Sequence, residues 1–129
     1  MDEFELVARY FDHPQAGRGQ VTLGIGDDGA VLAHTPGTES VVVTDTLVCG
    51  THFHKEQPAA SIGHRALAVN LSDIAAMGAS AEWATLNLTL PSLDEYWVEQ
   101  FAAALLALAR RYDIALVGGD TTRGPLSVT

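Results

Sequence analysis

The stretch that decides the fold runs from Pro58 to Gly78 and reads PAASIGHRALAVNLSDIAAMG. It is rich in alanine, proline stands at its start and glycine lies just past its end, an asymmetry typical of helices. The sequence therefore predicts one long helix from Pro58 to Met77. Asp73 is unusual inside it, because aspartate is a poor helix-interior residue and its neighbours are apolar. We expect Asp73 to have a buried partner, on the helix face that it shares with Asn70.

The segments that follow this helix read as strand, helix and strand. Trp83 to Leu90 alternates in hydropathy and predicts a strand, while the alanine- and leucine-rich stretch from Asp94 to Tyr112 predicts a second long helix. Ile114 to Val117 predicts a buried strand that breaks at Gly118-Gly119. A last short strand is expected to start near Leu126.

The segments that precede it are shorter. Phe4 to Phe11 has helical spacing, and two apolar segments, Val21 to Ile25 and Ala30 to Ala33, flank a cluster of turn formers. The first segment predicts a helix, and the two apolar segments predict two strands joined by a turn. Three consecutive valines between Ser40 and Thr44 predict a strand that is buried on both faces.

Composition limits the class of protein. The 129 residues suit one globular domain, and 47% of them are hydrophobic. Acidic residues number 16 against 7 basic ones, which argues against a nucleic-acid or anionic membrane partner and favours cations. The single cysteine, Cys49, excludes an internal disulfide. With an acidic N-terminus and no apolar run of membrane-spanning length, the sequence predicts a soluble cytoplasmic protein.

Four aspartates occur where a strand or helix meets a polar or glycine-rich turn: Asp28, Asp45, Asp73 and Asp120. Each taken alone is open to a structural role, since aspartate is a common turn former. Asp45 and Asp120 directly follow apolar segments, so both are predicted to project from strand ends into a shared crevice. Converging carboxylates need a cation, and oxygen-only ligands favour Mg²⁺ over zinc. Because Mg²⁺ leaves positions for phosphate oxygens, such a site implies a nucleotide.

Other nucleotide and metal motifs do not match. The chain has no P-loop, and the scattered order of its acidic residues excludes an EF-hand. Cys49, His52 and His54 resemble a zinc cluster, but in an extended segment Cys49 and His52 face opposite sides, which disfavours zinc. His52 is open to two interpretations, a surface histidine or a donor to a substrate phosphate.

Four motifs together resemble bacterial thiamine-monophosphate kinases: Gly24 to Asp28, Thr44 to Phe53, Ala66 to Ala79, and Gly118 to Pro125. Val43 departs from the pattern, because relatives often carry serine or threonine there. The resemblance implies roles for individual residues. The Mg²⁺ ligands of the family correspond to Asp28, Thr44, Asp45, Asp73 and Asp120. Its ATP contacts correspond to Gly119 and Asp120, and one of its substrate contacts corresponds to His52.

The resemblance also implies a fold and an activity. The fold would be α/β (α+β), a mixed sheet covered by helices as in the N-terminal domain of aminoimidazole ribonucleotide synthase, dimerising through the sheet. Residues 1–129 would form the N-terminal metal- and ATP-binding domain. A C-terminal domain follows in full-length members, so this chain alone is expected to be inactive.

The implied reaction transfers a phosphoryl group from ATP to thiamine monophosphate, giving thiamine diphosphate. Its acceptor is a phosphate that is already anionic near neutral pH, so no strong general base is required. The work left to the protein is to bring two anions together and stabilise their charge. The alternatives are another enzyme of the same superfold, of the aminoimidazole ribonucleotide synthase or selenophosphate synthetase type, or a non-catalytic Mg²⁺-dependent binding and dimerisation module.

Overall fold

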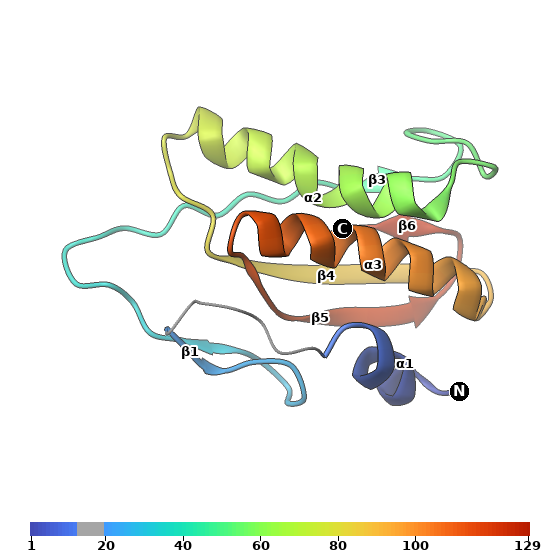
Figure 1. The fold of residues 1–129 in the computed structure, drawn as a ribbon, viewed down its shortest axis with the longest axis horizontal. Coiled ribbons are helices and arrows are strands. Elements are labelled where there is room, and N and C mark those ends of the chain that lie inside the picture. The colour runs from blue at the N-terminus through green and yellow to red at the C-terminus, as the bar shows by residue number, and fades with distance from the viewer. Residues whose placement is uncertain (13–19) are drawn as a thin grey trace.

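The computed structural model describes residues 1–12 and 20–129 (Figure 1). Three helices and six strands follow one another along the described residues. They are α1 (Glu3–Tyr10), β1 (Val21–Leu23), β2 (Val31–Leu32), β3 (Leu47–Val48), α2 (Ala59–Ala76), β4 (Trp83–Leu90), α3 (Glu95–Arg111), β5 (Ala115–Arg123) and β6 (Ser127–Val128). The predicted α/β class is confirmed.

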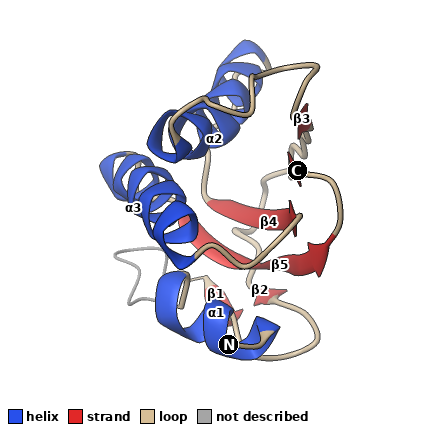
Figure 2. Cartoon of the chain, turned by 90° about the vertical axis from the view of Figure 1, so that its right-hand side faces the viewer, coloured by secondary structure: helices blue, strands red, loops and turns tan. Residues whose placement is uncertain are grey.

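The main sheet is mixed and has the strand order β3-β6-β4-β5. Strands β4 and β5 are parallel, whereas β6 runs antiparallel to its neighbours β3 and β4. Helices α2 and α3 lie on one side of this sheet (Figure 2). Along β4, Leu86 and Leu88 are buried, whereas Thr85 and Asn87, which alternate with them, are exposed. The sheet therefore has one apolar face under the helices and one polar face, which we call the open face.

Helix α3 lies at the centre of the core. Phe101 is fully buried, stacks on Trp97 with a centroid distance of 5.1 Å and meets Phe11 edge-on at 6.5 Å. Helix α1 packs on it through Leu6, which is 1% exposed. Burying aromatic rings of this size contributes several kcal/mol, roughly 3–5 for each Phe removed to Ala. The amphipathic helices predicted from sequence are thus held by one shared core.

Helices α2 and α3 approach each other closely at Gly63. A Cβ atom built there would overlap the Phe101 carbonyl oxygen and lie 3.1 Å from its carbonyl carbon. Glycine costs an α-helix about 1 kcal/mol relative to alanine. Its presence inside α2 is explained by this backbone contact, which leaves no room for a side chain.

Residues 40–45 do not form the strand that their valines predict. The segment continues the line of β3 but carries no backbone hydrogen bond to any described residue, and Val42 is 87% exposed. Strand propensity favours an extended chain, but a strand also needs neighbours for its N–H and C=O groups. The described chain supplies such a neighbour only from Leu47 onward, where β6 pairs with β3.

Strand β5 does not break at Gly118-Gly119, so that prediction is wrong. It continues to Arg123, and its ladder with β4 passes through one register shift opposite Ala84 and Thr85. Gly119 follows this shift at a φ of +142°, which glycine adopts without strain. The two glycines thus carry the strand past an irregularity rather than ending it. The predicted strand from Trp83 to Leu90 has the same bounds in the structure, and the first helix lies one residue earlier at each end than predicted. The other predicted helices and strands are present with shorter ends.

Candidate functional site

Polar side chains form a row across the open face of the sheet. Asn87 pairs with Asp120 of β5 on one side, and on the other it exchanges backbone hydrogen bonds of 2.7 and 2.8 Å with Thr129. The Thr129 hydroxyl lies 2.9 Å from that of Thr46. Paired residues on neighbouring strands share a face. Asp120 therefore joins Asn87, Thr129 and Thr46 in one polar row, in which Thr129 is half-buried and the other three are exposed.

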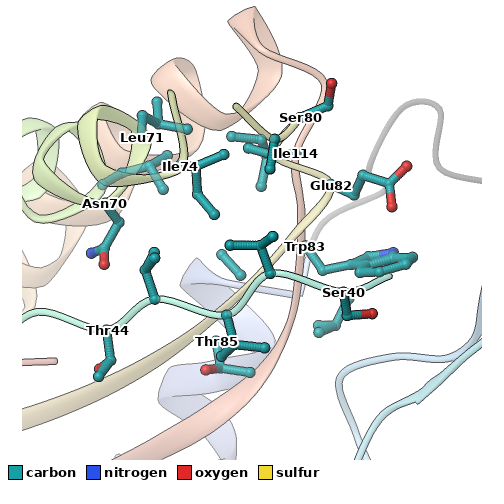
Figure 3. A pocket seen from close by; sticks show the side chains of 18 of the residues that line it. Ser40, Thr44, Asn70, Leu71, Ile74, Ser80, Glu82, Trp83, Thr85 and Ile114 are labelled. Atoms are coloured by element: carbon teal, nitrogen blue, oxygen red, sulfur yellow. The ribbon is translucent and has the colours of Figure 1, made fainter. Parts of the chain in front are cut away.

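Thr44 and Asp45 lie beside a cavity of about 860 Å³. The cavity separates residues 38–45 from α2 and from the first half of β4 (Figure 3). Exposure alternates along the segment, with Thr44 and Thr46 exposed and Asp45 half-buried between them. Asn70 of α2 projects toward the same segment. Of the four predicted aspartates, Asp45 is the one that lines this cavity.

The structure does not bring Asp45 and Asp120 together. Asp45 precedes β3 at one edge of the sheet and Asp120 belongs to β5 at the other edge, with β6 and β4 between them. At about 4.8 Å per strand, their backbones are separated by roughly 14 Å. A single metal ion cannot contact both carboxylates in this arrangement. Asp120 was predicted at the end of a strand, and this is wrong, because it lies inside β5.

Asp28 and Asp73 are both exposed. Asp28 sits in the turn between β1 and β2, where its N–H donates to the Asp27 carboxylate over 2.8 Å. The prediction that Asp73 has a buried partner is wrong: its carboxylate faces solvent and makes no hydrogen bond or ion pair with a described residue. The buried residues of α2 all lie between Ala59 and Leu67, so Asp73 is in the part of the helix that the core does not bury.

Within the described residues, no three His, Cys, Asp or Glu side chains gather closely enough to hold one metal ion. The predicted ligands therefore do not form a ready-made cage. Their chemistry still suits Mg²⁺, which prefers oxygen donors and commonly uses one or two carboxylates with water or phosphate oxygens completing its shell. Neither is a zinc site assembled from Cys49, His52 and His54.

His52 is held with one ring nitrogen engaged. Its Nδ1 accepts a hydrogen bond of 2.8 Å from the N–H of Val48. Since a backbone N–H only donates, Nδ1 carries no proton here and the ring proton lies on Nε2. Arg65 of α2 fixes the same loop, because its Nη1 donates to the His52 carbonyl over 2.7 Å. His52 is thus an exposed side chain whose Nε2 makes no hydrogen bond to a described residue.

Gly119 has a structural role independent of any ligand. A Cβ atom at this position would overlap the Leu86 carbonyl, because the positive φ turns the side-chain direction toward β4. At the neighbouring Gly118 a Cβ would meet no atom within 4 Å. The glycine pair is therefore asymmetric, with only the second position requiring glycine.

Sequence reasoning missed two residues of the site. Asn87 has no signal of its own in a strand that simply alternates, and only the register of β4 with β5 and β6 places it beside Asp120 and Thr129. Asn70 was recognised only as sharing a helix face with Asp73, whereas its amide is half-buried and lines the cavity with Asp45. A polar residue at a partly buried helix position was the available signal for Asn70.

No helix among residues 1–12 and 20–129 combines the length and the apolar content needed to cross a bilayer. Comparison with known proteins gives relatives that are thiamine-monophosphate kinases. The thiamine-monophosphate kinase of Escherichia coli is 54% identical over 127 residues, which cover 98% of this chain and 39% of that protein. The chain thus spans about two fifths of the length of such relatives.

Solved structures agree with this similarity. The crystal structure of thiamine-monophosphate kinase from Stenotrophomonas maltophilia superposes with a TM-score of 0.80 at 50% identity, covering 96% of this chain and 38% of that one. A structure described as AaThiL complexed with AMPPCP and TMP gives a TM-score of 0.61 at 32% identity, over 65% of this chain and 28% of that one. The family described as AIR synthase related protein, N-terminal domain, matches residues 26–129. With its mixed sheet, its covering helices and this match over most of its length, the chain belongs to the family of AIR synthase related N-terminal domains.

Proposed function

We propose that this chain is the N-terminal, metal- and nucleotide-binding part of a thiamine-monophosphate kinase, which transfers a phosphoryl group from ATP to thiamine monophosphate. The observation that carries the proposal is the 54% identity to the Escherichia coli kinase over 127 residues. A structure of the related AaThiL contains AMPPCP and TMP, which supports ATP and thiamine monophosphate as the two substrates. In the proposed protein, residues 1–129 are one domain and further domains complete the active site.

His52 and Arg65 are the proposed contacts for the phosphate of thiamine monophosphate. The His52 Nε2–H is exposed and free to donate, and Arg65 brings a positive charge to the same loop in a chain whose net charge is −9. A phosphate dianion accepts charge-assisted hydrogen bonds from both kinds of group. Positioning of this kind is the main protein contribution to phosphoryl transfer.

Mg²⁺ is the proposed metal, and its proposed ligands are Asp28, Thr44, Asp45, Asp73 and Asp120. Because these residues are spread over the domain, we propose that each ion is held by one or two of them and that the phosphate oxygens of ATP complete its shell. When bound, Mg²⁺ neutralises the negative charge of the phosphate groups. Gly119 and Asp120 are the proposed ATP contacts on β5.

The proposed assembly is a cytoplasmic homodimer formed through the open face of the sheet. Val42 supports this proposal, because an 87% exposed valine gains by being covered. Light scattering at micromolar concentration tests it, and a mass of one chain only would count against it.

The nucleotide part of the proposal is tested by thermal stabilisation. ATP with Mg²⁺ at about ten times its dissociation constant should stabilise the chain by about 1.4 kcal/mol, whereas Mg²⁺ alone should give a smaller shift. The variant Asp28→Asn should lose much of this stabilisation, and the adjacent Asp27→Asn, which keeps its acceptor oxygen, should retain it. Equal shifts with Mg²⁺ alone and with Mg²⁺ and ATP would instead support a non-catalytic binding module.

The catalytic part is tested with a coupled assay for thiamine diphosphate. We expect no measurable turnover by this chain alone, because imperfect positioning costs phosphoryl transfer orders of magnitude in rate. Turnover within about tenfold of a full-length kinase would show that these residues hold the whole active site.

A further inference from the structure

The cavity beside Asp45 has the form of an empty strand position. One wall is the extended segment 40–45 and the other is the first half of β4, while Leu71 and Ile74 of α2 project over it (Figure 3). Val128, the last residue of β6, and Thr129 after it also line the cavity. Since β6 lies between β3 and β4 in the sheet, the cavity is in line with β6. We call this space the strand slot.

Both walls of the strand slot carry unpaired backbone groups. Asn87 directs its N–H and C=O toward Thr129, so by the alternation of a strand Thr85 directs its own groups into the slot. On the other wall, Cys49 donates its N–H to Leu126. In an extended segment every second residue directs its backbone N–H and C=O groups to the same side. Asp45 and Val43 lie an even number of residues before Cys49, so their backbone groups face the slot. None of these slot-facing groups of Thr85, Asp45 and Val43 bonds to a described residue.

Two buried side-chain atoms around the slot also have no partner among the described residues. They are Oδ1 of Asn70, whose amide nitrogen donates to the Ala66 carbonyl over 2.9 Å, and Nε1 of Trp83. Both residues line the cavity. A buried amide oxygen or indole N–H without a partner costs about 1–3 kcal/mol. Such groups point to an occupant that carries both donors and acceptors, as a peptide backbone does.

We propose that the strand slot accepts an extended polypeptide strand that continues β6 and pairs with segment 40–45 on one side and with β4 on the other. The occupant we assign is the chain that follows Thr129 in the longer relatives, which match this chain over only 39% of their length. It reaches the slot directly from β6, with no loop to close. Pairing on both sides converts residues 40–45 into the strand that their valines predict.

The register of β6 specifies the pattern of this strand. Val128 of β6 pairs with Leu47 on one side and with Leu88 on the other. Continuing both antiparallel ladders places the first residue after Thr129 between Asp45 and Leu86. The third residue falls between Val43 and Ala84 by the same count. These positions lie under α2, so the occupant should be apolar at alternate residues and polar between them. Occupancy fixes the backbone of Thr44 and Asp45.

The test uses the 129-residue chain extended after Thr129 by about seven alternating valine and threonine residues, a common strand length. The matched control carries proline at the second and third added residues, since proline cannot donate to a central ladder. Amide hydrogen exchange should slow at least tenfold at Val43, Asp45 and Thr85 relative to the control. Exchange at Val42 and Thr44, whose N–H groups point away from the slot, should not change.

A second readout does not depend on exchange rates. In a Trp97→Phe background, which leaves Trp83 as the single tryptophan, the valine-threonine extension should shift the emission of Trp83 and the proline control should not. Equal exchange in the two extended chains, or equal slowing at Val42 and Val43, overturns the proposal. Protection of Val43 in the unextended chain that rises with protein concentration also overturns it, because a second copy would then be the occupant.

Discussion

Replacing Gly119 by alanine is expected to destabilise the chain far more than the same change at its neighbour Gly118. Gly119 has a φ of +142°, whereas Gly118 has no positive φ. An alanine Cβ at Gly119 would overlap the carbonyl of Leu86 in β4, and at Gly118 it would meet nothing within 4 Å. The two variants change the same chemistry in the same strand, so their difference isolates backbone geometry.

The magnitude follows from two costs. Holding alanine in a region that favours glycine costs about 1–3 kcal/mol, and shifting backbone to relieve the overlap costs about 1–3 kcal/mol more. The middle of the summed range, about 4 kcal/mol, is a large part of a total stability of about 5–15 kcal/mol. For a domain of this size it lowers the Tm by roughly 10–20 °C. Gly118→Ala should stay within about 0.5 kcal/mol of the parent chain.

Thermal and urea unfolding followed by circular dichroism measure this difference. Two variants whose Tm values lie within about 3 °C of each other would refute the reasoning, since β5 would then accommodate a side chain at Gly119. The result also bears on the proposed nucleotide site. Any loss of ATP binding in Gly119→Ala has to be measured well below its Tm, where unfolding does not contribute.

Three further changes test the packing. Gly63→Ala should cost about 1–3 kcal/mol from the clash with the Phe101 carbonyl, less about 1 kcal/mol from better helix propensity, and an increase in Tm would contradict the close approach of α2 and α3. Phe101→Ala should cost about 3–5 kcal/mol because the ring is fully buried, and urea unfolding with a loss below about 1 kcal/mol would argue against its central place. Asp94→Ala should cost about 1 kcal/mol by removing the cap on the Trp97 N–H, with Asp94→Asn as a control that retains the acceptor and most of the stability.

The sequence determined the helices and most strands, because their signals are local. Proline and glycine at the two ends of the stretch from Pro58 to Gly78 marked α2 to within about a turn, and alternation along Trp83 to Leu90 gave the bounds of β4. Burial followed from the same periodicity, since Leu86 and Leu88 face the helices. The motifs that resemble the kinase family are likewise contiguous, so they were readable without a structure.

Tertiary structure alone decided what depends on neighbours. Val41 to Val43 have the propensity for a strand, but pairing needs a second chain segment, and none is described beside them. The Gly118-Gly119 pair has the composition of a turn, yet the ladder with β4 carries the strand through it. Asp45 and Asp120 each looked like the end of a strand, but the order of strands in the sheet, which no local pattern encodes, sets them at opposite edges.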